Sequence, residues 1–82
     1  MGGLDVTGKS FKDPNWTPLE KMAGPRACEQ FMWMWRENGV EFYKHLLTRR
    51  YLLLDCRGQC YRQSESGLER AEFKEEMLRV TA

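Results

Sequence analysis

The sequence has few cysteines, no long apolar run and almost no net charge, and each shortage excludes a class of protein. Three cysteines in 82 residues are an odd number that does not suit a disulfide framework, so we expect reduced thiols. No apolar stretch approaches the ~20 residues of a membrane-spanning helix. No basic segment followed by an apolar run marks a secretory leader. We therefore expect a cytoplasmic protein without a membrane partner.

The charges nearly cancel, with 13 lysine and arginine residues against 12 aspartate and glutamate residues. Such a chain has no overall field that draws it to nucleic acid, so any such binding has to come from a local patch. Because 41% of the residues are hydrophobic, the chain is expected to fold rather than to be disordered. The sequence predicts a flexible N-terminal arm, residues 1–15, or one short edge strand in its place, and a single small α+β domain, residues 16–82.

The arm contains GLDVTGKS, Gly3 to Ser10, which matches the phosphate-binding pattern GxxxxGK[ST] at each required position. A working motif follows a buried strand and leads into a helix whose backbone amides face the phosphates. Two residues before Gly3 are too few for a strand, and Pro14 prevents a helix from continuing after Ser10. We therefore expect no nucleotide binding and no cofactor.

Capping signals predict one helix near each end of the domain. Thr17 followed by Pro18 favours a short helix over residues 18–23. Ser66 and Glu69 have the spacing of a capping box. They precede three apolar residues at helical spacing, Phe73, Met77 and Val80. The C-terminal segment is accordingly predicted to be a helix packed on one face of a sheet.

Two turn signals predict the sheet itself. Asn38-Gly39 stands between alternating apolar residues and is typical of a two-residue hairpin turn. Asp55 to Gly58 suits a three-residue hairpin loop. The expected fold is therefore a short N-terminal helix, a four-stranded antiparallel sheet of two β-hairpins and a C-terminal helix.

The register of the first hairpin decides which side chains share a face. Because successive strand residues point to opposite faces, we expect one face to form the core beneath the C-terminal helix. Its members are Phe31, Trp33, Trp35, Val40, Phe42 and Leu46. Arg36 and Glu41 should pair across the opposite, solvent side. In the second hairpin the register leaves open whether Tyr51 and Leu53 or Leu52 and Leu54 face the core.

Metal binding and catalysis are both disfavoured. Four residues could supply a Cys3His zinc site, Cys28, His45, Cys56 and Cys60. The three residues between Cys56 and Cys60 are unlike the usual two of zinc knuckles, and the apolar pattern provides a core without metal. A single histidine in a chain with little room for a substrate pocket does not indicate an enzyme. We expect no metal site and no catalytic residues.

The second face of the sheet is too apolar for a plain solvent face, so either the helix over residues 18–23 and the N-terminal arm fold over it, or it is the functional surface. The first hypothesis is a protein-interaction module of the adaptor type, which binds another protein or a second copy of the chain. The candidate interface residues are Met32, Met34, Arg36, Tyr43 and His45.

The alternative hypothesis is binding of single-stranded nucleic acid, in particular RNA. Tyrosine rings would stack on bases while arginine and lysine side chains contact phosphates. The candidate residues are Tyr43, Lys44, Arg49, Arg50, Tyr51, Tyr61 and Arg62. The neutral charge balance favours the protein-interaction hypothesis at this point.

Overall fold

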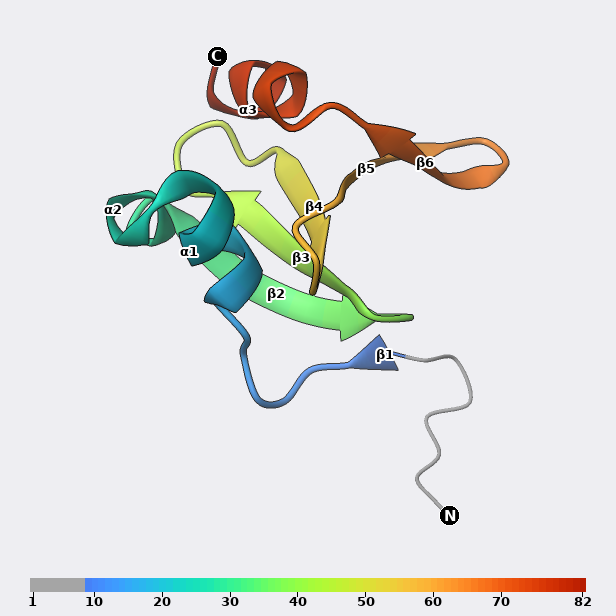
Figure 1. Ribbon diagram of the computed structural model, residues 1–82, viewed down its shortest axis with the longest axis horizontal. Coiled ribbons are helices and arrows are strands. Elements are labelled where there is room, and N and C mark those ends of the chain that lie inside the picture. The colour runs from blue at the N-terminus through green and yellow to red at the C-terminus, as the bar shows by residue number, and fades with distance from the viewer. Residues whose placement is uncertain (1–8) are drawn as a thin grey trace.

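The computed structural model describes residues 9–82, which form a sheet of six strands and three helices (Figure 1). In chain order the elements are β1 (Lys9–Ser10), α1 (Thr17–Ala23), α2 (Pro25–Cys28), β2 (Phe31–Glu37), β3 (Val40–His45), β4 (Tyr51–Asp55), β5 (Cys60–Ser64), β6 (Gly67–Ala71) and α3 (Phe73–Thr81). The strands lie in sequence order, each antiparallel to the next. The predicted α+β class is confirmed, whereas the prediction of four strands is wrong.

The strand β1 lies in the segment that was predicted to be an arm. Lys9 pairs with Glu37 and Ser10 with Arg36, so the chain after residue 8 follows the edge of β2. The guanidinium of Arg36 also donates to the carbonyl oxygen of Asp13 at 2.7 Å. The residues before Lys9, which hold most of the GxxxxGKS match, lie outside the described part of the chain.

The strand β6 occupies residues where the C-terminal helix was predicted to begin. Its five residues pair with all five of β5, and the hairpin turn ends at Gly67, whose φ is 119°. The helix α3 begins only at Phe73, after Glu72, whose carboxylate accepts a hydrogen bond from the Glu75 amide at 3.1 Å. The capping box predicted at Ser66 is therefore wrong. Pairing with the edge of β5 satisfies backbone groups that would otherwise lack partners, and this outweighs a weak local preference for helix.

A β-bulge at Met34 divides β2 into two halves with opposite facing. Near the turn the predicted register is confirmed, with Trp35 opposite Phe42. Beyond the bulge Trp33 is opposite Tyr43, and Met34 has no partner on β3. An extra residue in one strand reverses the facing of the side chains on its one side relative to those on its other side. Here the residues from Phe31 to Trp33 are the reversed ones. The predicted single core face is therefore wrong, because Trp33 and Trp35 lie on opposite faces.

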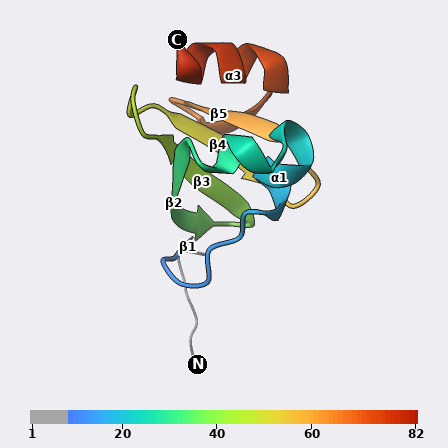
Figure 2. The same ribbon diagram turned by 90° about the vertical axis from the view of Figure 1, so that its left-hand side faces the viewer.

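All three helices pack on the face that carries Trp33. The core there joins residues from α1, α3 and the middle strands: Leu19, Phe31, Tyr43, Leu52, Leu54, Cys60 and Val80. Figure 2 shows α1 in front of these strands and α3 above them. The open register is thereby decided, since Leu52 and Leu54 belong to this core and Tyr51 and Leu53 face the other way.

The buried carboxylate of Glu41 anchors the first hairpin to the segment before α1. Glu41 is 2% exposed and accepts hydrogen bonds from Trp33 Nε1 at 2.7 Å and Arg36 Nε at 2.8 Å. Asn15 Nδ2 lies 3.4 Å from the same carboxylate, and the Tyr43 hydroxyl donates to the Asn15 carbonyl at 2.6 Å. The pair of Arg36 and Glu41 forms as predicted, but it is buried beneath residues 13–15 rather than on a solvent side.

Deleting Met34 tests the bulge. The deletion removes the β2 residue that has no partner on β3 and keeps Trp33 opposite Tyr43 and Trp35 opposite Phe42. Both tryptophans therefore keep their faces, and we expect the free energy of unfolding in urea to fall by under about 1.5 kcal/mol. Met34→Ala keeps the chain length and should cost under about 1.5 kcal/mol, since Met34 is only half-buried. A loss of roughly 3 kcal/mol or more on deletion would instead show that Met34 is a regular strand residue, because its removal would then move Phe31 and Trp33 to the wrong face.

Cys60 gives the core a measurable pH dependence. Burial, followed by the nearby charge of Glu76, raises the pKa of the Cys60 thiol from 9.0 to about 11. A raised pKa in the folded state gives stability that is complete below pH 9 and lost as the pH rises towards 11. We expect a loss of about 2 kcal/mol across this window in urea unfolding. Cys60→Ala should show a shallower slope, and an unchanged slope would contradict this assignment.

Candidate functional site

The face of the sheet opposite the helices is the most distinctive surface of the molecule, and we call it the open face. At its centre Val40, Phe42 and Leu53 are buried. Three partly buried aromatic residues pack around them, Trp35, Tyr51 and Tyr61. Within residues 9–82, no helical residue belongs to this cluster. The open face is thus an aromatic surface that the protein's own helices leave uncovered.

Close ring contacts fix the aromatic side chains of the open face. Trp35 stacks on Phe42 with ring centroids 4.7 Å apart and 20° between the ring planes. Tyr51 lies 5.6 Å from Trp35 and 6.5 Å from Phe42. The indole Nε1 of Trp35 donates to Glu37 Oε1 at 3.1 Å. Rings that are held in this way can present a face or an edge to a ligand with little further loss of conformational entropy.

Two lysines lie against these rings. Lys9 Nζ is 5.2 Å from the centroid of a Trp35 ring, and Lys44 Nζ is 5.9 Å from the centroid of Tyr51. Lys9 also lies 3.9 Å from a carboxylate oxygen of Glu37. Cations at these distances are attracted to the aromatic ring. The rings of the open face are therefore accompanied by positive charge.

Tyr61 is oriented by a carboxylate in the turn between β4 and β5. Its hydroxyl donates to Asp55 Oδ2 at 2.9 Å, while Asp55 Oδ1 accepts the backbone N–H groups of Arg57 and Gln59, each at 2.9 Å. The hydrogen bond to Asp55, followed by partial burial, raises the pKa of Tyr61. Partial burial opposes ionisation of Asp55, but the hydrogen bonds from Gln59, Tyr61 and Arg57 together lower its pKa. This network keeps the Tyr61 hydroxyl protonated and its ring fixed.

The open face continues into a gap between β4 and β5. These strands pair only through Leu53 with Tyr61 and Leu54 with Cys60. Where they separate, there is a pocket of about 320 Å³, and its lining includes three arginines: Arg50, Tyr51, Leu53, Arg62, Gln63 and Arg79. Figure 1 shows the β5–β6 hairpin extending away from the body of the sheet at this point. Tyr51 contributes both to this pocket and to the aromatic cluster.

The five residues predicted to form a protein interface do not share one exposed surface. Tyr43 is 0% and His45 4% exposed, both on the helix-covered side, and Arg36 is bound to Glu41 and Asp13. Met34 is half-buried at the bulge, and Met32 is 50% exposed. The bulge turns the start of β2 over, and α1 with the segment before it covers Tyr43 on β3.

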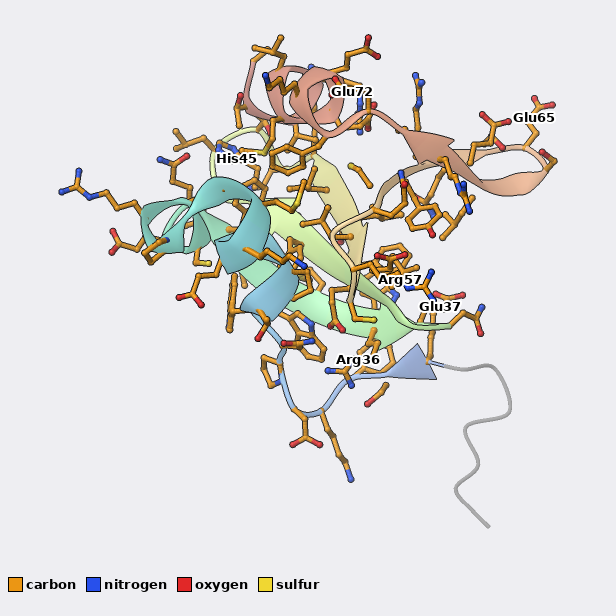
Figure 3. The ribbon with its side chains drawn as sticks, viewed as in Figure 1. Arg36, Glu37, His45, Arg57, Glu65 and Glu72 are labelled. Atoms are coloured by element: carbon orange, nitrogen blue, oxygen red, sulfur yellow. The ribbon has the colours of Figure 1, made fainter. Side chains whose placement is uncertain are left out.

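His45 has a structural environment. Its ring packs edge-on against Phe31 at 5.0 Å, and its Nδ1 accepts the backbone N–H of Thr48 at 3.2 Å. Figure 3 shows it near the helices, away from Glu37 and Arg57 at the other end of the sheet. These contacts hold the β3–β4 loop and leave the imidazole little access to a ligand.

The structure separates the seven predicted nucleic-acid-binding residues into three places. Tyr43 is buried in the helix-covered core. Arg49 lies in the β3–β4 loop and lines a different pocket, together with Met32 and Lys44. The remaining five surround the open face or line its pocket, Lys44, Arg50, Tyr51, Tyr61 and Arg62.

Sequence reasoning missed three residues that the fold adds to this group. Trp35 was assigned to the core because the bulge was not foreseen. Lys9 belonged to a segment expected to be an arm, and Arg79 to a helix whose position on the sheet was unknown. Trp35 and Tyr51 could have been assigned to one face from the sequence only if the face on which each residue of β2 lies had been known.

The thiols are distributed through the molecule instead of converging. Cys28 is half-buried, Cys56 exposed and Cys60 buried. Among the described residues, no three histidine, cysteine or acidic side chains lie close enough together to hold a metal ion. Likewise, no helix within residues 9–82 has the length and apolar character needed to cross a membrane.

Comparison of the chain with known protein families, with curated proteins and with solved structures found no match in any of the three. Its chemistry therefore has to be argued from its own residues.

Asp55→Asn tests the orientation of Tyr61. The amide removes the negative charge that opposes ionisation of the phenol, so we expect the pKa of Tyr61 to fall towards its ordinary value of 10.0. The measurement is the absorbance of tyrosinate as a function of pH, compared with Asp55→Asn/Tyr61→Phe to isolate this residue. Superimposable titrations of the wild type and Asp55→Asn would contradict the hydrogen bond.

Proposed function

We propose that this protein is a non-enzymatic module that binds single-stranded nucleic acid, with RNA as the first ligand to test, on the open face of its sheet. One observation carries the proposal: three partly exposed aromatic rings lie together on a face whose apolar cluster includes no helical residue among residues 9–82, accompanied by lysines and an arginine-lined pocket. Aromatic rings stack on unpaired bases, and neighbouring cations contact the phosphates.

The arrangement favours a single strand over a duplex. Bases in a duplex are already stacked on one another, and their faces are inaccessible to side chains. The rings of Trp35, Tyr51 and Tyr61 offer flat apolar surfaces rather than hydrogen-bonding groups that read base edges. We therefore expect weak dependence on base sequence and strong dependence on salt.

The distribution of charge changes the earlier ranking of the two hypotheses. A net charge of +1 spread evenly would favour a protein partner. Five basic residues instead lie against the rings or line the adjacent pocket, Lys9, Lys44, Arg50, Arg62 and Arg79. The apolar centre of the face is buried within the monomer and offers little area to a protein interface. Binding of a protein partner or of a second copy stays a prediction.

The test is fluorescence anisotropy with a labelled single-stranded RNA of about ten nucleotides, a length within the range that one small domain covers. Tyr51→Leu keeps apolar volume but removes the ring, and we expect binding to weaken about tenfold through lost stacking. Lys44→Ala should weaken binding and lower the slope of log affinity against log salt by about 1.

Lys21→Ala is the matched control, since Lys21 is an exposed lysine in the last turn of α1. It should leave both the affinity and the salt slope unchanged. An equal loss in Lys21→Ala and Lys44→Ala would show unspecific attraction to positive charge. Sedimentation equilibrium of the free protein reports self-association, which would support the protein-interaction hypothesis if RNA does not bind.

A further inference from the structure

The pocket between β4 and β5 collects three arginines from separate parts of the chain. Arg50 precedes β4, Arg62 lies in β5 and Arg79 in α3. The pocket exists because β5 pairs with β6 along its whole length but with β4 at only two positions. Arg79 Nη2 lies 3.3 Å from the carbonyl oxygen of Tyr51, an acceptor at the point where the strands separate. The side chains that line the pocket therefore come from both sides of the gap where β4 and β5 are no longer paired.

A buried carboxylate holds two of these guanidinium groups in place. Glu76 is 2% exposed, and its Oε1 accepts from Arg79 Nε at 3.1 Å and Nη2 at 2.8 Å. Its Oε2 lies 3.7 Å from Arg62 Nε. Two bonds from one guanidinium to a carboxylate restrict the orientation of that guanidinium. The arginines are thus positioned before any ligand arrives.

The third arginine is attached to the same helix by a different bond. Arg50 Nη1 donates to the carbonyl oxygen of Arg79 at 2.6 Å. A guanidinium has five N–H donors, so this bond leaves Arg50 able to donate to a ligand in the pocket as well. Arg62 and Arg79 also remain accessible, with side chains 53% and 42% exposed.

The charges around the pocket do not cancel. Arg62 and Arg79 share the carboxylate of Glu76, whereas the lining of the pocket itself, among residues 9–82, holds three arginines and no acidic residue. Like charges gathered in one pocket repel each other, and a bound anion relieves this repulsion. A phosphate monoester carries close to two negative charges at pH 7 and has three terminal oxygens that guanidinium groups can bind, whereas a phosphodiester carries one charge.

We infer that this pocket binds a phosphate monoester, the terminal phosphate of a nucleic-acid strand whose end nucleotide lies against Tyr51. The inference rests on the proposed function, because Tyr51 joins the pocket to the aromatic cluster and so links the phosphate to a stacked base. Arg50, Arg62 and Arg79 donate to the phosphate oxygens, and Glu76 positions two of them. The ligand class is therefore single strands that end in a phosphate.

The experiment compares three strands of one sequence, with a 5′-phosphate, with a 3′-phosphate and with hydroxyls at both ends. We expect one of the two phosphorylated strands to bind about tenfold more tightly than the unphosphorylated strand, as fits hydrogen bonds between charged groups. Inorganic phosphate at millimolar concentration should weaken binding of that strand and leave binding of the unphosphorylated strand unchanged.

Arg50→Gln is the decisive variant, because Arg50 has no bond to the buried Glu76 and its loss should not affect folding. Arg50→Gln should reduce the ratio of affinities between the phosphorylated and the unphosphorylated strand from about tenfold to under about threefold. The affinity for the unphosphorylated strand should stay nearly the same. Arg62→Gln should act in the same direction. Arg26→Gln, an exposed arginine in α2, is the matched control and should keep the full advantage.

The outcomes separate this inference from the proposed function. Equal binding of all three strands overturns the terminal-phosphate site and leaves the proposed function standing. Absence of binding by every strand at low salt overturns both. If inorganic phosphate binds in an Arg50-dependent way, as measured by amide chemical shifts, while no strand binds, the pocket is a site for free phosphate and the assignment to a strand end is wrong.

Discussion

The extra residue at Met34 is the constraint on which the rest of the structure depends. Because β2 changes its facing there, Phe31 and Trp33 join the core beneath the helices while Trp35 joins Phe42 on the opposite face. One strand thereby supplies large aromatic side chains to both sides of a thin sheet. Without the bulge the open face would lose its tryptophan or the core would lose two aromatic residues.

Two buried carboxylates complete this architecture in similar ways. Glu41 binds Trp33 and Arg36 and attaches the segment before α1 to the sheet, whereas Glu76 binds Arg62 and Arg79 and attaches α3 to β5. A buried carboxylate costs free energy unless charged or N–H partners surround it, so each one fixes the side chains around it. The first attaches the segment before α1 to the sheet, and the second orients the arginines of the pocket between β4 and β5.

The parts of the fold that depend on local chemistry were predictable from sequence. Asn38-Gly39 adopts the positive φ values that its hairpin turn requires, 51° and 80°. The bulge was not predictable, because FMWMW alternates aromatic residues with methionine and both kinds suit either face, so no polar residue marks where the register shifts. β6 was missed because GLERA has no apolar alternation and acquires its structure from the edge of β5. The arginine pocket could not be foreseen, since its members meet only through tertiary packing.

The two-position junction between β4 and β5 divides the sheet into unequal parts, one made of β1 to β4 and the other of β5 and β6. The helix α3 spans the junction, with a hydrogen bond to Tyr51 on one side and an ion pair with Arg62 on the other. In terms of local stability, the β5–β6 hairpin can separate from β4 with the loss of few backbone hydrogen bonds, so its amide protons should exchange before those of β3. A ligand held between Arg50 on one side of the junction and Arg62 on the other would join the two parts. A ligand bound as we propose would therefore protect the amide protons of the β5–β6 hairpin against exchange.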